Sequence, residues 1–178
     1  MPPCRGAVHL RRATEDDAPA LARIEARAMR AAFADVFPGR IPELTGVADH
    51  ERAWRRELAM LPEALRPSVA DIDGRPVGFI AATPSEAARS AGTPESVELT
   101  VFVDPDCWAQ GIARRLVEHE IRLLRRIGRA DMSTWIVVGD ARARAFCEAL
   151  GWRPDGTRRT RPLGAASAEE ERYRAPSA

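Results

Sequence analysis

The chain contains no lysine and no asparagine, and it has a single tyrosine, Tyr173, among 178 residues. The absence of lysine excludes a P-loop, because the Gly-Lys-Ser/Thr sequence of that motif uses lysine to reach a bound phosphate. Arginine and alanine are abundant instead. We interpret this bias as drift toward GC-rich codons, so neither one arginine nor one missing asparagine identifies a site by itself.

Long apolar runs are also absent, and no charged leader precedes a signal-like apolar stretch. The formal net charge is +1, which predicts no nucleic-acid or membrane partner. The three cysteines, Cys4, Cys107 and Cys147, are odd in number and widely spaced, which is typical of a reducing cytosol and argues against a disulfide framework or a zinc site. We expect a cytoplasmic protein with no metal, in which a loose leader over residues 1–7 precedes a single domain over 8–175.

The most informative segment joins an apolar run, 97–103, to a polar turn and then to a helix. The run is rich in β-branched residues and is stopped by Asp104-Pro105, which predicts a buried strand. The turn carries the small residues Gly111 and Ala113 and opens a helix whose first turn holds two arginines. Unpaired N–H groups at a helix start point to one place and attract anions, and small residues let a ligand approach the backbone. The segment predicts a site for a phosphorylated cofactor.

The spacing of this turn discriminates between cofactors. The dinucleotide fingerprint G-x-G-x-x-G is not present. Trp108-Ala-Gln-Gly-Ile-Ala113 instead resembles the Arg/Gln-x-x-Gly-x-Gly/Ala motif with which the GCN5-related N-acetyltransferases cradle the pyrophosphate of acetyl-CoA. Trp108 departs from that motif at its first place, where it removes one side-chain donor.

Three further segments resemble the same family. Residues 140–152, Asp-Ala-Arg-Ala-Arg-Ala-Phe-Cys-Glu-Ala-Leu-Gly-Trp, are similar to the family's Asn-x-x-Ala-x-x-Phe-Tyr-x-x-x-Gly-Phe. Residues 73–80 look like its Asp-Gly-x-x-Val-Gly hairpin, and 171–174 resemble the closing strand of many bacterial members. The similarity extends from Val8 to Arg174. It implies an acetyltransferase with acetyl-CoA as its co-substrate.

Hydrophobic periodicity and turn signals predict the order β-α-α-β-β-β-α-β-α-β-β. The expected strands are 8–12, 68–72, 77–83, 97–103 and 132–138. Four helices are expected: one from Thr14 to about Phe33, and three that cover 50–60, 111–127 and 141–150. A final hairpin is expected to turn at 164–168. An irregular segment is expected around Pro38 and Pro42, and a flexible loop at 84–94. The resemblance implies an α/β fold of α+β layers, with a mixed, mostly antiparallel sheet of six to seven strands, a splayed central parallel pair and about four flanking helices.

If the strands ending at Val103 and Val138 are parallel neighbours, their carboxyl ends can splay apart. The backbone of residues 101–103 would then be free to pair with the two amides of pantetheine, as an added strand would. The cofactor-binding residues expected from this reasoning and from the resemblance are Val101, Phe102, Val103, Trp108, Gln110, Gly111, Ile112, Ala113, Arg114, Arg115 and Asp140.

Acetyl transfer to an amine needs a neutral nucleophile, a stabilised oxyanion and a proton for the leaving thiolate. Glu98 is the one acid in the central strand and is our candidate base, although a polar residue near a strand end needs no catalytic role. The resemblance places Cys147 where the family has its tyrosine acid. An ordinary thiol has a pKa near 8.5 and could exchange a proton with CoA, but cysteine is also a good small core residue. Tyr173 is the alternative acid.

The acceptor is left open by the sequence. Acidic residues of the first helices favour an amine, whereas arginines of the last hairpin favour an acidic acceptor. The acids are Asp35, Glu43, Asp49 and Glu51, and the arginines are Arg158, Arg159 and Arg161. Two functions remain: an N-acetyltransferase acting on a small molecule or peptide amine, or a degenerate acyl-CoA-binding module without turnover. A homodimer is also expected, through the turn at Trp152 and the strand of Tyr173.

Overall fold

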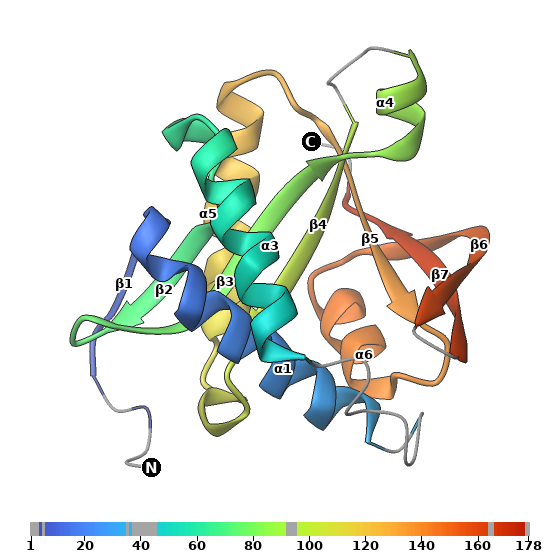
Figure 1. Cartoon of the computed structure of the whole chain (residues 1–178). Coiled ribbons are helices and arrows are strands. Elements are labelled where there is room, and N and C mark those ends of the chain that lie inside the picture. Colours follow the sequence, from blue (N-terminus) through green and yellow to red (C-terminus); the bar gives the residue numbers. More distant parts are fainter. Residues whose placement is uncertain are drawn as a thin grey trace.

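The computed structural model describes residues 4, 6–34, 36, 46–91, 96–163 and 166–176. A seven-stranded sheet runs through them in the order β1-β2-β3-β4-β5-β7-β6 (Figure 1). The strands are β1 Val8–Arg12, β2 Ser68–Ile72, β3 Arg75–Pro84, β4 Ser96–Val103, β5 Asp131–Val137, β6 Arg153–Leu163 and β7 Ala166–Arg174. Only β4 and β5 pair in parallel. The mixed, mostly antiparallel sheet with a central parallel pair is confirmed.

Five helices flank the sheet in the described part of the chain. They are α1 Ala18–Phe33, α3 Val47–Met60, α4 Glu86–Ala91, α5 Ile112–Arg126 and α6 Ala141–Ala149. Strand residues alternate between two cores: Phe79 packs with α1 and α3, whereas Ile80 packs with α5 and α6. Figure 1 shows α1 and α3 in front of the sheet and α5 behind it.

Helix α4 replaces part of the flexible loop expected at 84–94. The Ser85 hydroxyl accepts a hydrogen bond from the Ala88 amide at 3.0 Å, and Glu86 lies in the first turn. These are ordinary helix-start features, but the segment is too short and too rich in alanine and serine to show a periodic apolar face.

The parallel pairing of β4 with β5 is short. Cα partners run from Ser96↔Asp131 to Glu98↔Ser133, whereas β4 stays paired with β3 as far as Val103. Beyond Glu98 the two strands diverge, and Figure 1 shows them together at one end and apart at the other, beside α6. The expected splay is confirmed, and it leaves one backbone edge of β4 without a neighbouring strand.

Helix α5 is held against the sheet by a buried ion pair. The Glu120 carboxylate, of which 3% is exposed, accepts hydrogen bonds from Arg12 of β1 at 3.0 Å and from the Ser68 hydroxyl of β2. A buried carboxylate needs such donors, because removing one of them leaves an uncompensated buried charge. The network therefore sets the position of α5, and with it the position of that helix's first turn.

Two of the three cysteines form a disulfide. Cys4 and Cys107 are bonded, with their Cα atoms 5.3 Å apart, and both are buried. The sequence expectation of no disulfide is wrong for this pair, because the two residues are 103 positions apart and carry no local spacing signal. The bond joins the chain before β1 to the turn after β4. Cys4, which lies in the leader expected over residues 1–7, is therefore fixed to the domain.

Two other expectations concern loops. The final hairpin was expected to turn at 164–168, but β7 begins at Ala166, which pairs with Leu163; residues 164 and 165 lie outside the described residues, as do Pro38 and Pro42. Within the described ranges, no helix has the length and apolarity needed to cross a bilayer.

Candidate active site

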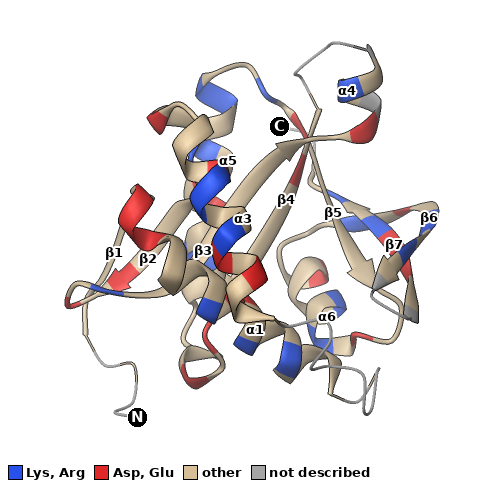
Figure 2. Cartoon of the chain, viewed as in Figure 1, with Lys and Arg blue, Asp and Glu red and all other residues tan. Residues whose placement is uncertain are grey.

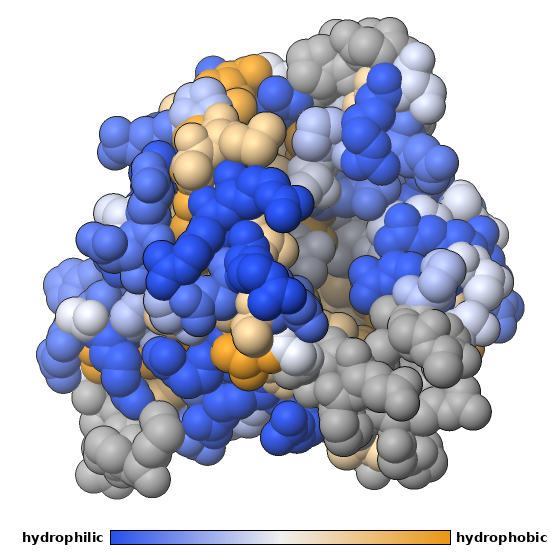
Figure 3. Space-filling model, in the orientation of Figure 1, coloured by the Kyte–Doolittle hydropathy of each residue, from blue (hydrophilic) through white to orange (hydrophobic). Residues whose placement is uncertain are grey.

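A cavity of about 690 Å³ opens where β4 and β5 diverge. Residues of α1, the central strands, the first turn of α5, α6 and the final hairpin line it. In Figure 3, the face seen in Figure 1 is hollowed at its centre, between hydrophilic side chains over α3 and over β6 and β7. Eleven of the predicted site residues line this one cavity: Glu98, Val101, Phe102, Val103, Trp108, Gly111, Ile112, Ala113, Arg114, Asp140 and Cys147.

The start of α5 forms an open cradle at one end of the cavity. Gly111 is its N-cap residue, with φ +75° and no side-chain cap, and Ala109 also has a positive φ of 61°. A Cβ built on Gly111 would meet no atom within 4 Å. The first amides of α5 therefore face open space in which an anion can be held by the helix start.

Trp108 and Arg142 stack beside this cradle. The Trp108 Nε1 donates to the Val103 carbonyl at 2.8 Å, and the Arg142 guanidinium lies 3.7 Å from the centre of its ring. A cation over an indole face is a favourable contact, and both side chains line the cavity. Arg142 thus brings a positive charge next to the motif position where Trp108 replaces arginine. Sequence reasoning missed Arg142, because its partner lies 34 positions away and no spacing links them.

The other residues predicted to bind the cofactor near the start of α5 differ in whether they can reach a ligand in the cavity. Ile112 is 1% exposed, so its side chain belongs to the core and only its backbone can serve a ligand. Arg114 lines the cavity and donates to the Ala149 carbonyl at 3.0 Å. Arg115 donates instead to the Val8 carbonyl of β1, and neither it nor the exposed Gln110 is among the lining residues.

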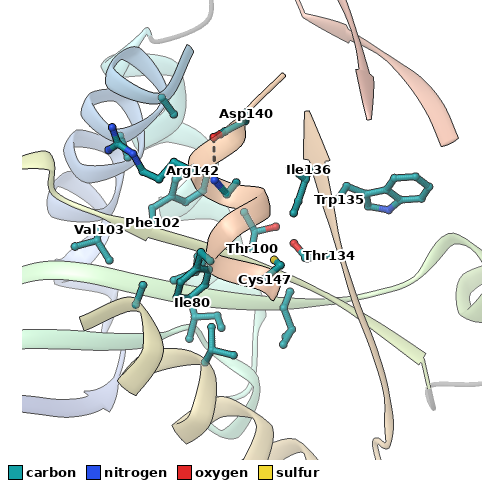
Figure 4. A pocket seen from close by; sticks show the side chains of 18 of the residues that line it. Ile80, Thr100, Phe102, Val103, Thr134, Trp135, Ile136, Asp140, Arg142 and Cys147 are labelled. Atoms are coloured by element: carbon teal, nitrogen blue, oxygen red, sulfur yellow. Dashed lines mark hydrogen bonds between the residues drawn. The ribbon is translucent and has the colours of Figure 1, made fainter. Parts of the chain in front are cut away.

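Asp140 caps α6. Its Oδ1 accepts a hydrogen bond from the Ala143 amide at 2.9 Å, drawn as a dashed line in Figure 4. An aspartate oxygen can satisfy an orphan N–H of a helix start as well as an asparagine oxygen does. The side chain lines the cavity, and its carboxylate is occupied by the cap.

The backbone edge of β4 is only partly free. The Val103 carbonyl, which we expected to be open to a ligand, accepts the Trp108 indole N–H. The Val101 and Phe102 positions pair with β3 on the opposite edge and have no strand beside them toward β5. An extended amide ligand therefore has room to pair along β4 before Val103.

Cys147 lies on α6, beneath the gap between the two strands. It is 5% exposed, and in Figure 4 it lies beside Thr134 of β5. Burial, reinforced by the carboxylates of Glu148 and Asp140, raises the pKa of Cys147 to about 12. The thiol therefore stays neutral at ordinary pH, and the premise of an ordinary thiol pKa does not hold here.

Tyr173 is a core residue. It is 2% exposed and packs with Ile136, Cys147 and Trp152, and burial raises the pKa of its phenol. It is not among the lining residues of the cavity.

A line of alternating charges forms the other end of the cavity. Glu98 shares one face of β4 with Thr100 and Phe102, which is the face that α1 covers. Its Oε2 lies 3.8 Å from Nη1 of Arg159. Arg159 Nε is 2.7 Å from Oε2 of Glu170, and Arg161 Nε is 3.4 Å from Oε1 of the same carboxylate. All four side chains line the cavity. Glu170 was missed by sequence reasoning, because three consecutive glutamates, 169–171, give β7 no apolar alternation that would single out the buried one.

Trp135 supports this charged line. The Arg159 guanidinium lies 4.0 Å from the centre of its ring, and Figure 4 shows the indole on the side of β5 that faces away from Cys147. Its Nε1 is buried and has no hydrogen-bond partner among the described residues. The indole ring therefore orients the guanidinium group of Arg159, while its own Nε1 stays without a hydrogen bond in the described part of the cavity wall.

Three of the other acceptor candidates, Asp49, Glu51 and Arg158, are not among the residues that line the cavity. Asp49 and Glu51 of α3 pair with Arg52 and Arg55 of the same helix. Arg158 pairs with Glu169 and Glu171 and is absent from the lining. Asp35 and Glu43 lie outside the described residues. No cluster of three or more potential metal ligands occurs in the described part of the chain.

The arrangement defines a class of protein: a mixed sheet whose central parallel strands splay over an anion cradle at a helix start. The family model described as Acetyltransferase (GNAT) family matches residues 26–152. The chain belongs to this family.

Known relatives agree with that assignment. An uncharacterized N-acetyltransferase of Methanocaldococcus jannaschii is 29% identical over 84 residues, which cover 47% of this chain and 37% of the relative. The match thus spans little more than a third of that protein. A GCN5-related N-acetyltransferase of Rhodopseudomonas palustris has a TM-score of 0.76 at 18% identity and covers 97% of each chain. The PaiA N-acetyltransferase of Thermoplasma acidophilum, in complex with coenzyme A, has a TM-score of 0.69 at 13% identity and covers 93% of this chain and 98% of its own.

Proposed function

We propose that residues 8–175 form a single N-acetyltransferase domain that moves an acetyl group from acetyl-CoA to a primary amine of a small molecule or peptide. One observation carries the proposal: a single cavity joins an open helix start to the splayed edge of β4 and to an acid, Glu98. Family membership supports acetyl transfer, and the complex of the Thermoplasma neighbour supports coenzyme A as the carrier.

The two ends of the cavity suit the two substrates. The amides that start α5 and the guanidinium groups of Arg114 and Arg142 suit the pyrophosphate. The open edge of β4 suits the amides of pantetheine. This placement brings the thioester to the point where β4 and β5 part, close to Glu98 and above Cys147.

The chemistry follows as direct transfer. Glu98 accepts a proton from the amine, whose nitrogen forms a bond to the acetyl carbon while the carbon–sulfur bond breaks. The leaving sulfur becomes the thiol of CoA with a proton from solvent. Because its pKa is about 12, Cys147 is a poor acid but can donate a hydrogen bond to that sulfur as a neutral thiol.

A matched pair of glycine variants tests the cradle. Gly111 and Gly128 lie before and after α5 with φ +75° and +77°, and a Cβ at either would meet no atom within 4 Å. Gly111→Val and Gly128→Val therefore carry similar backbone strain, about 1–2 kcal/mol, but only the first places a side chain in the cradle. Acetyl-CoA at a hundredfold excess over Kd should stabilise the wild type and the Gly128 variant by about 2.7 kcal/mol, and the Gly111 variant much less.

Turnover is tested separately by the release of free CoA thiol with a panel of amines. Acetylation of at least one amine, lost in Gly111→Val and retained in Gly128→Val, supports the enzyme. A thermal shift with acetyl-CoA but no thiol release with any amine would favour the alternative, a binding module without turnover. No shift at saturating acetyl-CoA would overturn both.

A further inference from the structure

The part of the cavity proposed to bind the acceptor has a negative charge on one side, at Glu98, and a positive charge on the other, at Arg161. Its four charges follow one another in the order Glu98, Arg159, Glu170, Arg161, with N···O separations of 3.8, 2.7 and 3.4 Å. The inner pair, Arg159 and Glu170, is joined by a direct hydrogen bond and is held by the stack on Trp135. The two outer groups, Glu98 and Arg161, are the ones left to meet a ligand.

The outer groups have little else to neutralise them. The only ion pair of Glu98 among the described residues is the 3.8 Å contact with Arg159, which is longer than a hydrogen bond. Arg161 has one ion pair in the same ranges, with a carboxylate that Arg159 already binds more closely. The side chain of Arg161 is 45% exposed, against 4% for Glu170. Its remaining N–H groups are therefore available to an anion that enters the cavity.

Apolar side chains also line the cavity, among them Met29, Ala32 and Phe33 of α1 and Val137 of β5. Phe33 packs against the cluster that Val137 forms with Ala168. Methylene groups suit such a lining. Arg159 and Arg161 lie two residues apart on β6 and so share one face of the sheet. Arg161 therefore lies further along β6 than Arg159, the arginine that contacts Glu98.

From this arrangement we propose that the acceptor is a small amine that also carries a carboxylate. The inference rests on the proposed function. The amine binds beside Glu98, which takes its proton during transfer, and the carboxylate binds the guanidinium of Arg161, a pairing with good hydrogen-bond geometry. Arg161 is then the residue that selects among amines, and it resolves the conflict between acidic and basic residues in the sequence.

The test compares pairs of amines that differ only in the carboxylate. β-Alanine, 4-aminobutyrate and 6-aminohexanoate are assayed against ethylamine, propylamine and pentylamine, by thiol release with acetyl-CoA. At least one amino acid should exceed its matched alkylamine tenfold or more in kcat/KM. That ratio should fall about tenfold in Arg161→Gln, recover in part in Arg161→Lys, and stay at its wild-type value in Arg158→Gln, which alters an arginine outside the cavity. A ratio near one in the wild type, or a ratio unchanged in Arg161→Gln, overturns the inference.

Binding separates this inference from the proposed function. The same amines are titrated by calorimetry into the protein saturated with free CoA, where no transfer occurs. Saturable binding of an amino acid, weakened in Arg161→Gln, supports the acceptor class even if no amine is acetylated, in which case the transfer function alone fails. Acetylation of alkylamines with no binding or preference for their carboxylated counterparts leaves the enzyme in place and removes the acceptor class. The calorimetric series also gives a result if Arg161→Gln is too unstable to assay, because the wild-type comparison stands alone.

Discussion

Glu98 is a carboxylate of the cavity lining that lies where β4 and β5 begin to diverge and that contacts Arg159 of the charged line. It is the last residue of β4 with a parallel partner on β5, Ser133. Its neighbours on the same face, Thr100 and Phe102, are not acidic. A group at this place is next to the amine when the thioester lies along β4.

Replacement of Glu98 tests that role. Glu98→Gln keeps the shape and removes the base, so kcat should fall about 10²–10⁴-fold while the affinity for acetyl-CoA changes little. Steady-state kinetics and a thermal shift with acetyl-CoA measure the two effects, and Glu51→Gln on α3, which does not line the cavity, is the control. A kcat within threefold of the wild type would assign proton removal to solvent and return Glu98 to a structural role.

Cys147 should contribute little to the chemistry. Because its pKa is about 12, its thiol stays protonated at every pH at which the enzyme is assayed, and activity should show no loss from its ionisation between about pH 7 and 10. Cys147→Ala should lower kcat less than about fivefold. Iodoacetamide should also leave Cys147 unmodified in the native protein, because thiolate, not thiol, is the nucleophile. A kcat loss above a hundredfold in the alanine variant would restore the acid role expected from the family motif.

At the scale of elements, the structure joins three separate chain segments around the cradle. The turn after β4 supplies the helix start, α6 supplies Arg142, and the segment before β1 supplies Cys4, which is bonded to Cys107 at the cavity wall. The cradle is thus held by a covalent bond on one side and by the buried Glu120 network on the other.

Reduction of the disulfide tests this support. A bond that closes a loop of 103 residues typically stabilises a domain by about 2–4 kcal/mol, so dithiothreitol should lower the melting temperature by about 5–15 °C. Affinity for acetyl-CoA should fall as well, because Cys107 lies directly before the cradle. Cys4→Ser should melt like the reduced wild type and be insensitive to dithiothreitol. Equal melting temperatures with and without the reductant would show that the bond does not form in solution.

Local signals in the sequence predicted most of these elements, but not their long-range contacts. The strand at 97–103, the glycine turn and the helix at 112–126 each have a periodic pattern or a turn residue of their own, and each is where we expected it. Helix α4 has neither length nor an apolar stripe and was missed. The disulfide, the Arg142 stack and the position of Glu170 depend on contacts between distant segments, which a single sequence does not predict. The family motif predicted the cradle, whereas the acceptor end required side-chain geometry.

At the scale of the whole molecule, the two ends of the cavity differ in the charges that line them. Arginines and a helix start gather at the cradle, and alternating signs gather at the hairpin. Figure 2 shows basic and acidic segments alternating along β6 and β7. The net charge of +1 therefore conceals a strong local pattern, which explains why composition alone gave no hint of the ligands.

The burial of Trp152 and Tyr173 bears on the expected homodimer. Trp152 and Tyr173, the residues that suggested a homodimer, are 3% and 2% exposed and pack in their own core, so they offer no surface to a second copy. The open edge beside them is β6, which carries Arg153, Arg158, Arg159 and Arg161. Like charges oppose the pairing of two such edges, and salt screens that repulsion.

We therefore expect any homodimer to pair through β6 and to be favoured by salt. Sedimentation at micromolar protein concentration should show a larger dimer fraction at about 0.5 M than at about 0.05 M ionic strength, because the Debye length shortens several-fold over that range. Thr160→Pro, which adds a third proline to β6 after Pro154 and Pro162 and removes a backbone donor, should abolish the dimer. Its acetyl-CoA shift should match the wild type, because Thr160 does not line the cavity. A species of 19.5 kDa at both salt concentrations would show that the chain acts as a monomer, with the site complete in one copy.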